Sequence, residues 1–110
     1  MTDENTFRPI TTHEAMDVLR NVHDPEFKAS IVDIGLIYGI DISDDGIVTV
    51  RMTLTSPGCP YAEMIVSTVI MMLEAQQSVT EAKIEMVWEP AWTTDRMSPN
   101  LRYEHDMDFW

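Results

Sequence analysis

The side chain best suited to chemistry in this sequence is the thiol of Cys59, the only cysteine in the chain. It follows the segment Thr53–Thr55, where a strand-like pattern ends, and precedes Pro60, where a helix-like pattern begins. Proline suits the first helical position because no N–H is needed there. A thiol at this junction faces unpaired N–H groups and the positive end of the helix dipole, which favour the reactive, metal-binding thiolate. The same position also suits an unreactive small residue that closes a turn.

A single cysteine limits the thiol chemistry that the chain can perform alone. A dithiol redox centre is excluded within one chain, and a zinc site or iron–sulfur cage usually needs about four ligands. A cluster would therefore be bridged between subunits, shared with a client protein, or completed by Asp33, Glu26 or small-molecule thiols. Nucleophilic catalysis would need a histidine base, and His23 is the histidine whose expected position reaches the thiol. Transient handling of a metal and cysteine hydrolase activity with His23 both stay open.

A helix is expected near the N-terminus. Thr11 and Glu14 have the spacing of a capping box, and apolar residues follow at helical intervals. The Asp24-Pro25 pair is expected to end this helix, because the residue before proline avoids helical geometry. We expect residues 1–11 to form a flexible arm and residues 12–110 a single domain with an acidic, aromatic C-terminal tail.

Between residues 31 and 55 the apolar residues change to a period of two, which predicts two half-buried strands of an antiparallel hairpin. The apolar faces of the two strands coincide when Ile42 pairs with Val48 across the turn. In this register Gly35 lies opposite Thr55.

The remaining pattern predicts a second helix over residues 61–76, a third strand over residues 83–89, and a loop with a short helical turn over residues 90–99. The order is then helix, strand, strand, helix, strand. A strand–helix–strand connection is normally right-handed and leaves its two strands parallel. With both helices on the single apolar face, we expect a two-layer α/β (α+β) sandwich with a small mixed sheet.

This topology gathers polar residues at one edge of the expected sheet. The second strand runs into Cys59 and the third ends at the same edge, while the first begins there. Ligand sites in open α/β sheets favour the carboxyl ends of strands. Each of these residues alone has a structural explanation, but their convergence predicts a site centred on Cys59. The residues expected to line it are Asp24, Glu26, Asp33, Thr53, Thr55 and Trp92.

Charge and composition restrict the partners. The chain of 110 residues has 19 acidic and 7 basic side chains, a net charge of −12. Such a surface repels nucleic acid and anionic membranes, so neither is expected as a partner. No apolar run approaches membrane-spanning length, and the polar N-terminus is not expected to be a signal peptide. A lone cysteine without an export signal favours the cytoplasm.

Four segments form a pattern between residues 12 and 98: Asp24-Pro25-Glu26, Ile31–Tyr38, Thr53–Pro60 and Trp88–Thr93. In their order and spacing they resemble the metal–sulfur cluster assembly factor family, which includes SufT-like and PaaD-like proteins. The resemblance implies a small α/β domain, often dimeric, with an accessory role in maturing iron–sulfur proteins. It also implies a reactive cysteine at Cys59 and site positions at Asp24, Glu26, Asp33, Thr53 and Thr55.

Two segments depart from the family pattern. Phe27-Lys28-Ala29 replaces a small, often glycine-containing stretch, and the acidic, aromatic tail over residues 104–110 is not part of the shared pattern. The first departure leaves the shape of the loop open, and the second leaves the identity of the partner open.

The leading hypothesis is a cytoplasmic, non-enzymatic factor in iron–sulfur protein maturation. Cys59 would bind iron or a nascent cluster transiently, with Asp33 as a further metal ligand and no permanently bound cofactor. The partners would be iron–sulfur client or assembly proteins, and the chain would form a homodimer. The alternative is an adaptor, or an oxygenase-associated subunit of the phenylacetate-degradation type, that docks partners through its apolar helix or aromatic tail without thiol chemistry.

Overall fold

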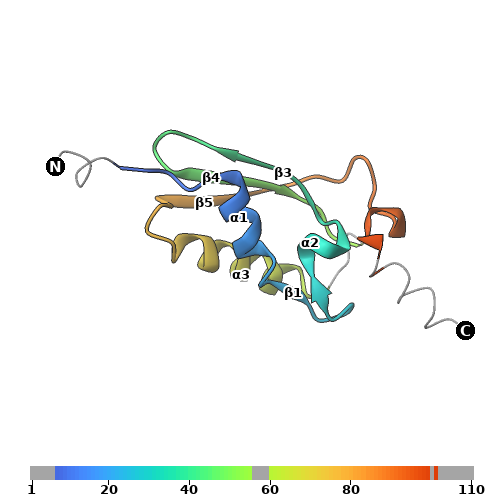
Figure 1. Cartoon of the computed structure of the whole chain (residues 1–110). Coiled ribbons are helices and arrows are strands. Elements are labelled where there is room, and N and C mark those ends of the chain that lie inside the picture. Colours follow the sequence, from blue (N-terminus) through green and yellow to red (C-terminus); the bar gives the residue numbers. More distant parts are fainter. Residues whose placement is uncertain (1–6, 56–59, 100, 102–110) are drawn as a thin grey trace, which may run out of the picture.

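A three-stranded mixed sheet and the helices that cover its apolar face form the frame of the protein (Figure 1). The computed structural model describes residues 7–55, 60–99 and 101. In chain order the elements are α1 (Thr12–Leu19), β1 (His23–Asp24), β2 (Ala29–Ser30), α2 (Ile31–Ile34), β3 (Ile37–Ile42), β4 (Ile47–Met52), α3 (Ala62–Glu74), β5 (Glu81–Met86) and the 3₁₀ helix η2 (Thr94–Arg96). The predicted α/β class is confirmed, and β1, β2 and α2 are additions to the predicted order.

The main sheet has the strand order β3-β4-β5. Strands β3 and β4 are antiparallel, and Ile42 pairs with Val48 as predicted. Strand β5 runs parallel to β4, with Met52 opposite Met86, which agrees with the predicted crossover through α3. Strand β5 ends earlier than predicted, so Trp88 lies beyond the sheet. The carboxyl ends of β4 and β5 therefore meet at one edge, as the predicted site requires.

Helix α1 begins with the predicted capping box. The Oγ1 of Thr11 accepts the N–H of Glu14 at 3.1 Å, and the Oε1 of Glu14 accepts the N–H of Thr11 at 3.0 Å. The backbone N–H of Thr11, and then its side chain, hold the pKa of Glu14 below its usual value. The helix ends at Leu19 and not at Asp24-Pro25, because β1 already pairs with β2 in an antiparallel ribbon.

The predicted start of the first hairpin strand at residue 31 is wrong, because residues 31–34 form the helical turn α2. The Oγ of Ser30 caps this turn by accepting the N–H of Val32 at 3.0 Å. Gly35 ends the turn in the left-handed conformation, with φ of +87°. Glycine suits this conformation because it has no Cβ.

The hairpin register also differs from the prediction at this end. A bulge lies between Ile37 and Gly39, and Ile37 pairs with Met52. Gly35 therefore does not lie opposite Thr55. The extra residue of the bulge shifts every position before it by one, an effect that alternation of apolar residues does not encode.

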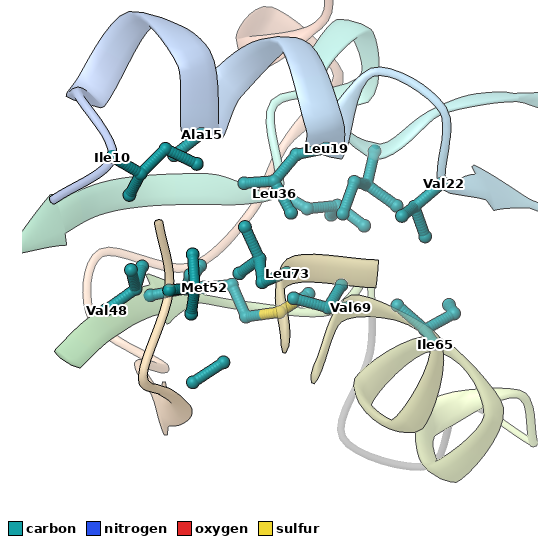
Figure 2. Packing of buried hydrophobic residues seen from close by; sticks show 14 of the residues in the cluster. Ile10, Ala15, Leu19, Val22, Leu36, Val48, Met52, Ile65, Val69 and Leu73 are labelled. Carbon is teal, nitrogen blue, oxygen red and sulfur yellow. The ribbon is translucent and has the colours of Figure 1, made fainter. Parts of the chain in front are cut away.

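The core lies where α1 and α3 meet the sheet (Figure 2). Figure 2 shows Leu19 of α1 facing Leu73 and Val69 of α3, with Met52 of β4 beside them. Such side chains each contribute about 1.5–3 kcal/mol when fully buried. The fully buried residues of these three elements are Ala15, Leu19, Val48, Val50, Met52, Ile65, Val69 and Leu73.

The predicted N-terminal arm is partly packed. Residues 1–6 lie outside the described residues, but Ile10 is buried and donates its N–H to the carbonyl of Ser78 at 3.1 Å. In the part of the chain that the structure describes, no helix has the length and apolarity to cross a membrane.

Candidate functional site

The Asp24–Lys28 turn, which joins β1 to β2, organises the candidate site. The carboxylate oxygen Oδ1 of Asp24 accepts the N–H of Glu26 at 2.7 Å, which is an Asx turn. The carbonyl of Asp24 accepts the N–H of Lys28, also at 2.7 Å. These bonds fix the backbone on both sides of Glu26, so its side chain leaves the turn at a defined place.

Within the described part of the chain, the other carboxylate oxygen of Asp24, Oδ2, lacks the hydrogen bond that buried polar atoms usually make. Asp24 is 1% exposed, and its Oδ2 has no hydrogen-bond partner among the described residues. A buried acceptor without a partner costs about 1–3 kcal/mol, and more when it is charged. Such an atom is a natural acceptor for a donor or cation that the described residues do not supply.

Glu26 and Thr55 are brought together as predicted. The hydroxyl of Thr55 donates to Oε1 of Glu26 at 3.4 Å, a long hydrogen bond between the β1–β2 turn and the end of β4. Thr53 lies deeper, is 1% exposed, and donates its hydroxyl to the carbonyl of Leu54 at 3.4 Å. Of the two threonines, Thr55 is therefore the one whose hydroxyl reaches a site carboxylate.

Asp33 lies elsewhere in the site region. It belongs to α2, and its side chain lines a hollow that it shares with Lys28 and Ser98. Its carbonyl accepts the N–H of Ser98 at 2.7 Å. The predicted position of Asp33 assumed a strand from residue 31, and the helical turn α2 moves it to this hollow.

Trp92 supports α2. Its Nε1–H donates to the carbonyl of Ile34 at 2.9 Å, and its ring lies 5.7 Å from the ring of Phe27, with the two planes tilted by 54°. Arg96 lies 4.0 Å above the ring of Tyr38, whose hydroxyl donates to the carbonyl of Pro90 at 2.6 Å. These contacts hold residues 90–98 against α2 and the start of β3.

A second, mostly apolar hollow of about 480 Å³, which was not predicted from the sequence, lies between the end of β4, α3 and the end of β5. Trp88 in its wall is 41% exposed. The broad apolar arc of α3 was the signal that could have predicted this surface. Its lining residues are Leu54, Ala62, Glu63, Val66, Ser67, Met86 and Trp88.

Cys59 itself lies outside the described residues, in the segment between Thr55 and Pro60. Thr55 contacts Glu26 of the Asp24–Lys28 turn. Over residues 7–55, 60–99 and 101, no group of three or more His, Cys, Asp and Glu side chains is placed to hold a metal ion. His23 is exposed and lines the hollow with Asp33 and Lys28. The described part of the site thus supplies carboxylate oxygens and a hydroxyl.

The fold and these residues define a small mixed α/β domain in which a carboxylate-bearing turn contacts Thr55, just beyond β4. The chain belongs to the iron–sulfur cluster assembly protein family, whose sequence pattern matches residues 12–85.

Known relatives and structures agree with this assignment. An "Fe-S protein maturation auxiliary factor" from Porphyromonas gingivalis is 43% identical over 94 residues, which are 86% of this chain and 90% of the relative. The auxiliary factor SufT from Staphylococcus aureus is 42% identical over 77 residues, 70% of this chain and 88% of that protein. A domain of unknown function from Bacillus anthracis has a similar structure, with a TM-score of 0.82, 33% identity and coverage of 86% of this chain and 91% of that one.

These names are those of auxiliary factors and not of enzymes, in agreement with the prediction of a non-enzymatic protein. The predicted PaaD-like relationship is also found. A protein from Escherichia coli provisionally named as a component of 1,2-phenylacetyl-CoA epoxidase is 30% identical over 98 residues, 88% of this chain and 58% of that protein.

Proposed function

We propose that this protein is a cytoplasmic auxiliary factor in iron–sulfur protein maturation that handles iron or a nascent cluster transiently through the thiolate of Cys59. The contact between Thr55 and Glu26 carries the proposal, because it ties the segment after β4, four residues before Cys59, to the turn that contains Glu26 and the buried Asp24. The match to maturation factors over most of the chain supports the same role.

The donor set explains why the cargo would be held transiently. Iron–sulfur clusters are normally held by thiolates, and one thiolate per chain cannot complete a cage of about four. Carboxylate oxygens also serve as ligands of ferrous iron. Glu26 and the unpartnered Oδ2 of Asp24 are therefore the groups of this chain that would hold iron beside Cys59 until a client takes it. Metal binding by Asp33 stays a prediction.

The partners follow from the same donor set. A second chain can complete a cargo that one chain holds incompletely, so we propose a homodimer or a client that supplies further thiolates. The net charge of −12 favours protein partners with basic surfaces over nucleic acid.

The test compares the full chain with its Cys59→Ala variant. We expect the variant to have the circular dichroism spectrum and Tm of the unsubstituted chain, yet to retain no iron and no visible absorption after anaerobic reconstitution. In cells that lack the protein, the variant should fail to restore the activity of iron–sulfur enzymes. An exposed cationic residue away from the site, Lys83, provides a matched control as Lys83→Ala. Full restoration by Cys59→Ala would overturn the thiol-centred proposal.

A second candidate function is a thiol-independent adaptor. The epoxidase-related protein and the exposed apolar side chains of Tyr61, Met64 and Trp88 around α3 favour it. The same cellular assay separates the two candidates. Full activity of Cys59→Ala, together with lost client capture by Trp88→Ala or by a chain cut after Leu101, would support the adaptor.

A further inference from the structure

The hollow that contains Asp33 is a feature that the proposed function does not use. It has a volume of about 650 Å³, within the range of small-molecule sites. Its walls come from the end of α1, the β1–β2 ribbon, α2 and the residues that follow η2, elements that Figure 1 shows gathered at one end of the molecule. The hydrogen bond from Ser98 to Asp33 closes one side.

The charge of this hollow is opposite to that of the molecule. Only 7 of the 110 residues are Lys or Arg, and Arg20 and Lys28 both line the hollow, together with His23. Asp33 is the acidic residue in its wall. An acidic protein thus concentrates two of its few cations around one cavity.

Both cations are available to a ligand. Arg51 is paired with Asp41 and Arg96 is stacked on Tyr38, but Lys28 has no ion-pair partner among the described residues. Arg20 pairs with Asp17 at 3.7 Å, where both side chains are more than half exposed. Exposed pairs of this kind contribute only about 0–1 kcal/mol, so Arg20 can exchange Asp17 for a ligand carboxylate at little cost.

The backbone at Lys28 supports a role for its side chain. Lys28 has φ of +55°, a left-handed conformation that is uncommon for residues other than glycine. Glycine would adopt this conformation without steric cost. A lysine here keeps an ammonium group at the cavity despite an unfavourable backbone conformation.

The walls also carry groups that suit the rest of a small polar ligand. The Oγ of Ser30 accepts the N–H of Val32, and the Oγ of Ser98 accepts the N–H of Leu101, so each hydroxyl retains its own proton to donate. Phe27 and Leu101 supply apolar surface.

We propose that this hollow binds a zwitterionic amino acid or short peptide. Its carboxylate pairs with Arg20 and Lys28, and its ammonium group pairs with Asp33. The negative charge of Asp33 repels a simple dianion and so weakens its binding. If the ligand carries a thiol, it would supply a thiolate that a chain with a single cysteine lacks; this last step rests on the proposed function, whereas the binding itself does not.

Titration calorimetry on the purified full chain tests the proposal with four probes: reduced glutathione, S-methylglutathione, succinate and inorganic phosphate. We expect both tripeptides to bind, because each has an ammonium group and carboxylates, and succinate and phosphate to bind more weakly. Arg20→Gln and Lys28→Gln should each weaken tripeptide binding about tenfold, the effect of losing one charge-assisted hydrogen bond. Lys83→Gln makes the same change of charge on β5, outside the hollow, and should leave binding unchanged.

Asp33→Asn separates a zwitterion site from a general anion site. It should weaken the tripeptides about fivefold, because their ammonium group loses its partner, and strengthen succinate. Lys28→Gly should preserve or raise the Tm, because it relieves the backbone, and still weaken binding. Cys59→Ser should leave S-methylglutathione binding unchanged, so the two proposals can fail independently. Absence of tripeptide binding, or stronger binding of all four probes to Asp33→Asn, would overturn the proposal.

Discussion

The two carboxylate oxygens of Asp24 lie in different environments. Its Oδ1 shapes the turn by accepting the N–H of Glu26, while its Oδ2 is buried without a partner among the described residues. The first atom explains why an aspartate suits the turn. The second is a cost to the fold that a bound cation or an additional donor would offset.

Asp24→Asn should therefore separate stability from function. Asparagine retains an acceptor for the N–H of Glu26 and removes the buried negative charge, but it puts an amide NH2, which needs an acceptor of its own, at the position of Oδ2. We therefore expect the free energy of unfolding to change by less than about 1 kcal/mol. Iron retention after reconstitution should fall. Thermal unfolding and iron counting measure the two effects, and Asp44→Asn at the exposed hairpin turn makes the same change of charge as a control. A Tm lower by many degrees for Asp24→Asn would show that the carboxylate makes a favourable interaction within the fold that the amide cannot replace.

At this scale the sequence predicted that Glu26 and Thr55 lie close together. Glu26 and Thr55 meet because the strand directions alone bring the turn and the segment that follows β4 to one edge. Asp33 could not be placed in this way, since its position depends on the helical turn α2. Trp92 was predicted as a site wall, and the structure gives its indole N–H a structural hydrogen bond to Ile34. The roles of these residues in binding stay predictions.

At the scale of elements, the short helix α2 depends on Gly35. This residue has φ of +87°, and a Cβ added to it would meet the carbonyl of Arg96. Both the backbone conformation and the close approach of another backbone segment therefore require glycine. The contact links α2 to the segment that carries η2.

Gly35→Ala should destabilise the protein by more than about 1 kcal/mol, because alanine is strained at positive φ and the Arg96 carbonyl must move. Gly39→Ala is a matched control. A Cβ at Gly39 would meet the end of the Arg51 side chain, which can rotate away, so we expect the smaller loss. Urea unfolding of both variants measures the difference. Equal losses would show that the approach of Arg96 to Gly35 is not a constraint.

Predictability at this scale follows from the length of the repeating pattern. The capping box, the alternating hairpin and the broad apolar arc of α3 each extend over several residues, and each predicted its element. The ribbon of β1 and β2 has two residues in each strand, which is too short to show a period. In α2, the Ser30 cap and Gly35 act locally against an alternating pattern that continues through them.

At the scale of the whole molecule, the excess of acidic residues is not balanced by ion pairs. The net charge is −12, and the ion pairs among the described residues join side chains that are accessible to solvent. Exposed pairs contribute little, whereas self-repulsion of a strongly charged surface opposes the compact state.

The Tm should therefore rise with ionic strength, because salt screens this repulsion more than it weakens the few exposed pairs. Thermal unfolding in dilute buffer and at physiological ionic strength measures the change. Choline chloride should act as well as sodium chloride if screening is the cause. A Tm that falls with added salt would mean that the surface ion pairs outweigh the repulsion.

The segment over residues 90–98 determines how late in synthesis this protein can complete its fold. Its contacts with Ile34, Gly35 and Tyr38 join positions 58, 61 and 52 residues apart in the chain. Contacts of such long range form late, and during synthesis they cannot form until Pro90, Trp92 and Arg96 have emerged from the ribosome. A nascent chain could already pair β3 with β4, but the wall that Ser98 contributes to the hollow that contains Asp33 would still be missing. A chain that ends before Ser98 would therefore have the β3–β4 hairpin but not the complete hollow in which we propose that a ligand binds.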